Sequence, residues 1–299
     1  GIATFWLFFS AGSTKLKWHT GGNSMRVLRR LATLLLIILL MIIPLEGVFG
    51  EPLSEEDIFL GKHGVFYQIF VRAFADGNGD GFGDLRGIID RMDYLTDLGV
   101  SGIWLTPIHP SPTYHKYDVT DYYAIDREIG TLEEFEELIT KAHSRGIRVI
   151  MDLVLHHTSR LHPWFIAATL DPQSPYRDYY IWADSDTNLS APGPWAQRVW
   201  HPHATGHYYG LFWDGMPDLN YDNPKVREEA KAIAEFWLAL GVDGFRLDAA
   251  MHMYAHAEKD RALDWWVEFR DHLRQIKPDA YLVAEVWDNS TVVAPYYEG

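Results

Sequence analysis

Charged side chains lie inside or directly after several short apolar runs of this sequence. IRVIMDLVL contains Asp152, VDGFRLDA contains Arg246 and Asp248, and YLVAEVW contains Glu285. In folds built on parallel strands, ligands bind beyond the carboxyl ends of the strands. Charged residues at those positions are therefore candidates for catalysis.

Asp248 and Glu285 could act as a nucleophile and a general acid. Asp248 lies two residues from Arg246 and hence on the same strand face, and the neighbouring positive charge favours an ionised carboxylate. Glu285 stands between Val283 and Trp287, where desolvation would favour the protonated carboxyl. Two carboxyl groups with these roles, about 5–5.5 Å apart, are what retaining glycoside hydrolysis requires.

Each of these residues also has a structural interpretation. Taken alone, Arg246 and Asp248 could form a structural ion pair, Glu285 a surface carboxylate, and His156 and His157 caps or surface residues. Zinc is disfavoured, because neighbouring strand residues point to opposite faces and no third ligand lies at metal spacing. The catalytic interpretation is favoured because all these positions fall at predicted strand ends.

The stretch DGNGDGFGD, residues 76–84, has the composition of a cation loop. Its candidate ligands are Asp76, Asn78, Asp80, the Phe82 carbonyl and Asp84. The first spacings fit an EF-hand, but position 12 falls on Gly87 where a bidentate glutamate is needed. The sequence predicts a single Ca²⁺ loop of another type, and a solvated acidic turn is the alternative.

Composition indicates a globular protein with a large core. Of the 299 residues, 47% are hydrophobic and 14% aromatic, and the formal net charge is −15. An acidic surface repels nucleic acid and anionic lipid, so a neutral ligand or a cation is expected. There is no cysteine, which excludes disulfides and thiol chemistry.

The segment from Met25 to Gly50 has the pattern of a signal peptide. Three arginines precede an apolar run over 31–43, and small residues precede Glu51. The apolar run is shorter than the roughly 20 residues that span a bilayer. We expect secretion to the periplasm or outside the cell after cleavage near Gly50, with an uncleaved anchor as the alternative. Residues 1–24 are an unassigned leader.

Apolar runs alternate with amphipathic segments after Glu51, which predicts an α/β fold with a parallel sheet, either a barrel or an open doubly wound sheet. Predicted strands are 65–71, 99–108, 147–155, 242–249 and 281–287. Predicted helices cover about 88–98, 131–142, 224–238 and 262–276. Between the third and fourth strands, about 158–215 is rich in Pro, Trp, Tyr and His, and indicates an inserted domain or long loop.

The chain resembles α-amylases of glycoside hydrolase family 13 over about residues 63–299. DLVLHH resembles the first signature of that family, GFRLDAAMH the second, EVWD the third, and MPDLN the extra motif of its inserted domain. The resemblance implies a (β/α)8 TIM barrel with a B domain, here about 158–215, inserted after strand three. It also implies that residues 51–299 hold only about the first five βα units.

The resemblance also implies roles for individual residues. Asp248 would be the nucleophile, Glu285 the acid/base and Arg246 the partner that keeps Asp248 ionised. Substrate-binding residues would be Asp152, His157, His252, His115, Tyr117 and Asp118. Loops similar to 76–84 bind calcium in oligo-1,6-glucosidases and some secreted amylases.

Three departures from the family pattern matter. His156 replaces an Asn that in many amylases binds a second calcium, and Met251 replaces a common Lys that helps to bind the leaving part of the substrate. The chain ends at Gly299, before the family's third catalytic carboxylate. With an unpaired sheet edge, the 299 residues alone are expected to be unstable and inactive.

For the full-length protein we expect a secreted, monomeric, retaining endo-hydrolase of α-1,4-glucosidic bonds in starch and maltooligosaccharides, without nucleic-acid or stable membrane partners. The alternative is an exo-acting α-glucosidase, an oligo-1,6-glucosidase or a trehalose synthase-like transglycosylase. YDVTDYY favours it, because Asp118 beside Tyr117 could close the site at one sugar. A non-catalytic glycan- or partner-binding barrel is disfavoured by the intact Arg246, Asp248 and Glu285.

Overall fold

The computed structural model describes residues 64–254 and 259–297. The predicted leader and signal peptide lie outside these residues. Within them, no helix has both the length and the apolar character needed to cross a membrane.

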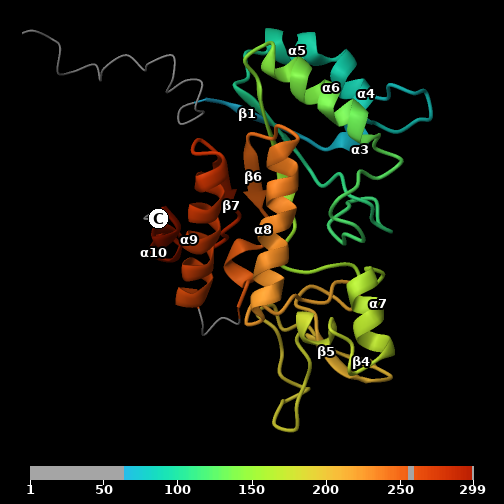
Figure 1. Cartoon of the computed structure of the whole chain (residues 1–299), viewed down its shortest axis with the longest axis vertical. Coiled ribbons are helices and arrows are strands. Elements are labelled where there is room, and N and C mark those ends of the chain that lie inside the picture. The colour runs from blue at the N-terminus through green and yellow to red at the C-terminus, as the bar shows by residue number, and fades with distance from the viewer. Residues whose placement is uncertain (1–63, 255–258, 298–299) are drawn as a thin grey trace, which may run out of the picture. The chain divides into compact units, whose positions relative to one another are not determined.

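Five parallel strands form the main sheet (Figure 1). They are β1 (Phe66–Ile69), β2 (Gly102–Leu105), β3 (Arg148–Leu153), β6 (Gly244–Leu247) and β7 (Tyr281–Ala284). The predicted strands are confirmed, each shorter than expected. Their order in the sheet follows the order in the chain, without the reversal of a doubly wound fold. Of the two architectures left open by the sequence, the barrel arrangement is therefore the one observed.

Helices follow the strands as the apolar periodicity predicts. The larger ones are α6 (Leu132–His143), α8 (Pro224–Ala239) and α9 (Lys259–Ile276), and α8 lies beside α9 (Figure 1). Thr131 and Glu134 form the predicted capping box at the start of α6, and the Asn223 side chain caps α8 with Pro224 at its first position. These caps satisfy backbone N–H groups that a helix start leaves without partners.

The helix predicted over 88–98 is two helices, α4 (Leu85–Asp90) and α5 (Met92–Asp97). Arg91 joins them with φ −100° and ψ 12°, outside helical geometry. Its N–H still donates to the carbonyls of Gly87 and Ile88, so the apolar stripe continues across the break. Short helical turns that the sequence did not predict are α3 (Val71–Phe74), α10 (Ser290–Val293), η3 (Ala250–His252) and η5 (Ala294–Tyr297).

The segment between β3 and α8 has secondary structure of its own. It contains α7 (Pro163–Leu170), η2 (Arg177–Tyr179) and an antiparallel hairpin of β4 (Trp200–His203) and β5 (Gly206–Tyr209). Aromatic contacts hold these pieces together. For example, the ring centroids of Phe165 on α7 and Tyr208 on β5 are 4.9 Å apart. The sequence indicated no regular element here, because α7 is apolar on all sides and shows no helical stripe.

Gly244 at the start of β6 should be indispensable for the sheet. Its φ is +153°, and a Cβ there would lie 1.8 Å from the Tyr281 carbonyl oxygen of β7. We predict that Gly244→Ala lowers the free energy of unfolding by more than about 3 kcal/mol, because neither backbone can move away within the sheet. Chemical denaturation would measure this loss.

Gly146→Ala is the matched control. Gly146 also has positive φ (+69°), but a Cβ there meets nothing within 4 Å, so only left-handed strain of about 1–2 kcal/mol is expected. Equal losses for the two variants would show that the β6–β7 approach is not the constraint.

Candidate active site

A cavity of about 480 Å³ lies at the carboxyl ends of the strands. We call it the first cavity. Six residues predicted from the sequence line it: His115, Tyr117, His157, Arg246, Asp248 and Glu285. Phe212, Trp213 and Met216 complete the lining. The sequence did not single out Phe212 or Trp213, although the aromatic composition of 158–215 was the available signal. Met216 is the first residue of the MPDLN motif.

Arg246 contacts three carboxylates at the carboxyl ends of the strands. Its Nη1 donates to Asp152 Oδ1 at 2.5 Å and to Asp248 Oδ1 at 2.6 Å, and its Nη2 lies 2.7 Å from Glu285 Oε1. Asp152 and Arg246 are register partners on β3 and β6. Their side chains therefore leave neighbouring strands at the same level, which brings residues 94 positions apart into contact.

Asp152 is fully buried behind this arrangement. Its Oδ2 accepts hydrogen bonds from Trp104 Nε1 at 3.0 Å and from the Tyr117 hydroxyl at 3.2 Å. Asp152 is not among the residues that line the first cavity, so it supports Arg246 and Tyr117 from behind. Trp104, on β2, is a contributor that sequence reasoning missed.

The electrostatics of Asp248 differ from the expectation. Burial raises the pKa of Asp248 to about 7, helped by repulsion from Asp152, while the Arg246 guanidinium acts in the opposite direction. Burial likewise raises the pKa of Asp152 to about 6. The expected ionised form of Asp248 thus dominates only above about pH 7, because burial and the neighbouring carboxylates outweigh the Arg246 guanidinium.

Glu285 lies in polar surroundings, and the expected desolvation among apolar neighbours is wrong. Its side chain is 27% exposed and accepts hydrogen bonds from the Ala249 N–H at 3.1 Å and from Trp287 Nε1 at 2.9 Å. Ala249 has a left-handed φ of +49°, which costs energy in a non-glycine residue and is typical of functional sites. In this conformation the Ala249 N–H points toward Glu285.

His156 and His157 contact each other, contrary to the expectation of opposite faces. Their Nδ1 atoms are 3.0 Å apart. The alternation of a strand does not apply, because β3 ends at Leu153. Burial lowers the pKa of His157 to about 4, so its imidazole is neutral near pH 7.

These histidines form a hydrogen-bonded chain. His157 Nε2 donates to the Tyr117 carbonyl oxygen at 3.1 Å, so its neutral Nδ1 must accept from His156 Nδ1. His156 Nε2 then faces Asp218 Oδ2 at 3.2 Å, and one proton lies between these two atoms. The chain joins the end of β3 to the MPDLN segment, and an imidazole stands where the family pattern has an amide.

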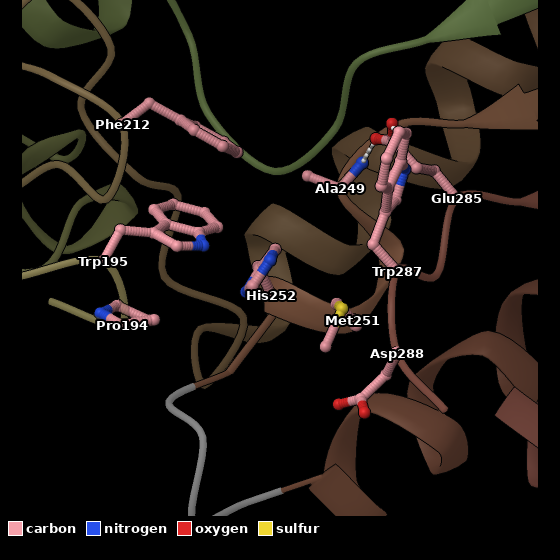
Figure 2. Close-up of a pocket in the computed structure, with 9 residues that line it drawn as sticks. All are labelled: Pro194, Trp195, Phe212, Ala249, Met251, His252, Glu285, Trp287 and Asp288. Atoms are coloured by element: carbon pink, nitrogen blue, oxygen red, sulfur yellow. Dashed lines mark hydrogen bonds between the residues drawn. The ribbon is translucent and has the colours of Figure 1, made fainter. Parts of the chain in front are cut away.

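His252 and Asp118 lie apart from the first cavity. The Asp118 carboxylate is buried and accepts hydrogen bonds from the hydroxyls of Ser111 and Thr113, so it does not face the cavity. His252 lines a second cavity of about 500 Å³. Figure 2 shows this second cavity, whose lining is Pro194, Trp195, Phe212, Ala249, Met251, His252, Glu285, Trp287 and Asp288.

The loop 76–84 uses its carboxylates to order its own backbone. Asp76 accepts from the N–H groups of Gly79 and Gly81 at 2.6 and 2.8 Å, and these bonds, that of Gly81 most, lower the pKa of Asp76. Asp84 Oδ1 accepts from the N–H of Gly87, the first-turn residue of α4 that the sequence placed at EF-hand position 12.

One oxygen of this loop is buried without a protein partner, Asp84 Oδ2. A buried carboxylate oxygen of this kind fits a hard cation. Among the described residues, no group of three His, Asp or Glu side chains is arranged to hold a metal ion. A cation here would therefore also need Asn78 and the Phe82 carbonyl.

Comparison with known proteins matches the chain to one protein family. A family model described as alpha amylase, catalytic domain, matches residues 68–299. Alpha-amylase 3 of Dictyoglomus thermophilum is 53% identical over 238 residues, covering 80% of this chain and 46% of that protein. A 4-alpha-glucanotransferase of Thermotoga maritima is 44% identical over 229 residues, with coverages of 76% and 50%.

Solved structures agree with this match. The crystal structure of an α-amylase from H. orenii superposes with a TM-score of 0.75 at 55% identity, over 79% of this chain and 50% of that one. The chain thus spans about half the length of the relatives that it matches. Its five parallel strands are part of a (β/α)8 barrel.

Replacing Asp248 should stabilise the fold above neutrality. The folded pKa of Asp248, about 7, exceeds the usual value of about 4, so the folded state holds the extra proton between these pH values. As pH rises through 7 the wild type loses stability that Asp248→Asn keeps. We predict that Asp248→Asn raises the Tm by a few degrees at pH 8 but not at pH 4.

The measurement is thermal unfolding of both proteins across this pH range. Asp97→Asn, a change at an exposed position of α5, should leave the Tm unchanged at both pH values. A lower Tm for Asp248→Asn at pH 8 would mean that Arg246 outweighs burial.

Proposed function

This chain belongs to the α-amylase family of glycoside hydrolases, and on that premise we propose that the whole protein is a retaining, endo-acting hydrolase of α-1,4-glucosidic bonds in starch and maltooligosaccharides. One observation carries the proposal. Asp248 and Glu285 face the first cavity and bind the two terminal nitrogens of the same guanidinium, that of Arg246. Sharing one group keeps these carboxyls close, as the separation of about 5–5.5 Å in retaining enzymes requires.

The two carboxyl groups divide the reaction between them. Asp248 attacks the anomeric carbon and forms a glycosyl ester, while Glu285 gives a proton to the departing oxygen. Water then attacks the anomeric carbon of the ester, and the bond between that carbon and the Asp248 oxygen breaks. The water proton passes to Glu285, which restores both groups. The partial exposure of Glu285 suits transfer of a proton to the leaving group. The burial of Asp248 suits attack on an enclosed sugar.

The remaining lining fits an uncharged sugar. Tyr117, Phe212 and Trp213 present aromatic surfaces to the first cavity, and such surfaces stack on sugar faces. The formal charge of −15 also favours a neutral substrate over a phosphorylated one.

An exo-acting or glucan-transferring enzyme is the second candidate. The 4-alpha-glucanotransferase of Thermotoga maritima is 44% identical to this chain, which supports it. The position of Asp118 does not, because a carboxylate held by Ser111 and Thr113 cannot close the cavity at one sugar. Endo action is therefore preferred.

Calcium and export belong to the same proposal. The loop ligands would be Asp76, Asn78, Asp80, the Phe82 carbonyl and Asp84, and the bound ion would fix the loop that leads into α4. The orphaned Asp84 oxygen supports this assignment. Export rests on the signal-peptide pattern of residues 25–50.

Activity on maltoheptaose tests the proposal. Asp248→Asn should lower kcat by at least about a thousandfold, because the substitution removes the nucleophile, while Asp97→Asn should retain full activity. With a maltoheptaose blocked at its non-reducing end, an endo-acting enzyme still releases internal fragments. Near-normal turnover by Asp248→Asn would remove Asp248 from its role, and inertness of the blocked substrate would favour the exo-acting candidate.

Calcium should raise the Tm of the protein. At about 1 mM Ca²⁺, in the range of extracellular calcium modules, we expect a rise of several degrees that a chelator reverses. Asp80→Asn should abolish most of this rise, because it removes a ligand charge but keeps an oxygen to accept the Phe82 N–H.

Asp184→Asn is the matched control, since Asp184 orders a similar exposed turn through Asp186 and Thr187. It should leave the calcium-dependent rise intact. A wild-type Tm that does not respond to Ca²⁺ would contradict the calcium assignment.

A further inference from the structure

Strained backbone lies directly beside the first cavity. Among the described residues, the non-glycine residues with a left-handed φ are Lys116, Ala196 and Ala249. This conformation costs energy in a residue with a side chain, and it persists only where the surrounding contacts hold it. The strain at Ala249 serves its N–H bond to Glu285. Lys116, with φ +65°, directly precedes Tyr117 of the first cavity, and its strain has no such explanation.

The Lys116 side chain ends in a buried ion pair. Lys116 is only 4% exposed, and Asp126 is buried as well. Lys116 Nζ donates to Asp126 Oδ2 at 2.7 Å. The Asp126 carboxylate also accepts hydrogen bonds from the N–H groups of Ser111 and Glu128, at 3.3 and 2.9 Å, so its position does not depend on the lysine alone. A lysine is rarely buried without a partner, and Asp126 therefore determines where this ammonium group lies.

A second carboxylate connects this ion pair to the segment that follows β1. Glu128 Oε2 lies 3.5 Å from Lys116 Nζ and accepts a hydrogen bond from Arg72 Nη1 at 2.6 Å. Arg72 belongs to α3, the helical turn after β1. We call Lys116, Asp126, Glu128 and Arg72 the lysine anchor. Its two positive and two negative charges balance, and it ties the strained turn to two other parts of the chain.

Tyr117 depends on this turn for its place in the site. Its N–H donates to His115 Nδ1 and its carbonyl accepts from His157 Nε2, each at 3.1 Å. Its hydroxyl donates to Asp152 Oδ2 at 3.2 Å. The left-handed turn at Lys116 sets the direction in which the chain enters these three bonds. The lysine anchor opposes the strain of the turn, and the ring of Tyr117 is thereby held at the first cavity.

We propose that Lys116 is a positioning residue, whose buried ion pair with Asp126 holds Tyr117 in place against the attacked sugar. The inference rests on the proposed retaining hydrolysis. Lys116 does not line the first cavity, so it acts on the reaction only through Tyr117. The loss of activity that follows from breaking the ion pair must therefore disappear in a protein whose residue 117 has no ring to position.

A double-mutant cycle with maltoheptaose tests this dependence in the full-length protein. Lys116→Met keeps an unbranched side chain but removes the charge, and should lower kcat/KM at least tenfold, because a small displacement of a positioning group is costly. Tyr117→Ala should lower kcat/KM by at least as much. In the Tyr117→Ala protein, adding Lys116→Met should change kcat/KM less than twofold. All values are taken per folded molecule, from unfolding curves at the assay temperature.

Lys231→Met is the matched control. Lys231 of α8 forms an ion pair with Glu268 at 2.6 Å and does not line the first cavity, so kcat/KM should stay unchanged with and without Tyr117→Ala. The combination of Lys116→Met with Asp126→Asn removes both charges and leaves no unpaired buried carboxylate. It should show the same tenfold loss, and it gives the measurement if Lys116→Met alone does not fold.

The outcomes separate this inference from the proposed function. Normal cleavage of maltoheptaose by the Lys116→Met protein overturns the inference and leaves the hydrolase intact, and so does normal cleavage by Tyr117→Ala. An equal loss from Lys116→Met with and without the Tyr117 ring also overturns it, because Lys116 would then act on the fold as a whole. Failure of the wild type to cleave maltoheptaose would remove the proposed function and the inference with it.

Discussion

The contact of one guanidinium with three carboxylates is the constraint on which the site depends. Arg246 meets Asp152, Asp248 and Glu285 within 2.7 Å, and the arrangement is largely buried. Buried charges are stable only when they are paired. Burial raises the pKa of both Asp152 and Asp248, and repulsion from Asp152 and Glu285 adds to the rise at Asp248. Asp152 and Asp248 therefore exchange protons near neutral pH, and the folded protein loses stability as the pH rises through the pKa of these groups.

The parallel sheet makes this contact possible. Its register sets Asp152 beside Arg246 and Arg246 beside Val283, so side chains from three strands leave the sheet at one level. Glycine at the start of β6 allows the close approach of β7.

The segment between β3 and α8 completes the site at the carboxyl ends of the strands. The chain of hydrogen bonds from Tyr117 through His157 and His156 reaches Asp218, and the segment's aromatic residues line both cavities. Glu285 stands where the cavities meet. The position of this one carboxyl therefore separates the surroundings of the attacked sugar from those of the group that leaves.

Local sequence determined the strands, the capped helices and the positions of Arg246, Asp248 and Glu285 at strand ends, because periodicity and capping act within a few residues. Tertiary structure alone decided the rest. Helix α7 has no hydrophobic stripe that could have indicated it. The contact of His156 with His157 depends on where β3 ends. The polar surroundings of Glu285 come from Arg246, Ala249 and Trp287. Burial and charge balance depend on residues distant in the chain, and so the protonation of Asp248 could not be predicted from its neighbours in sequence.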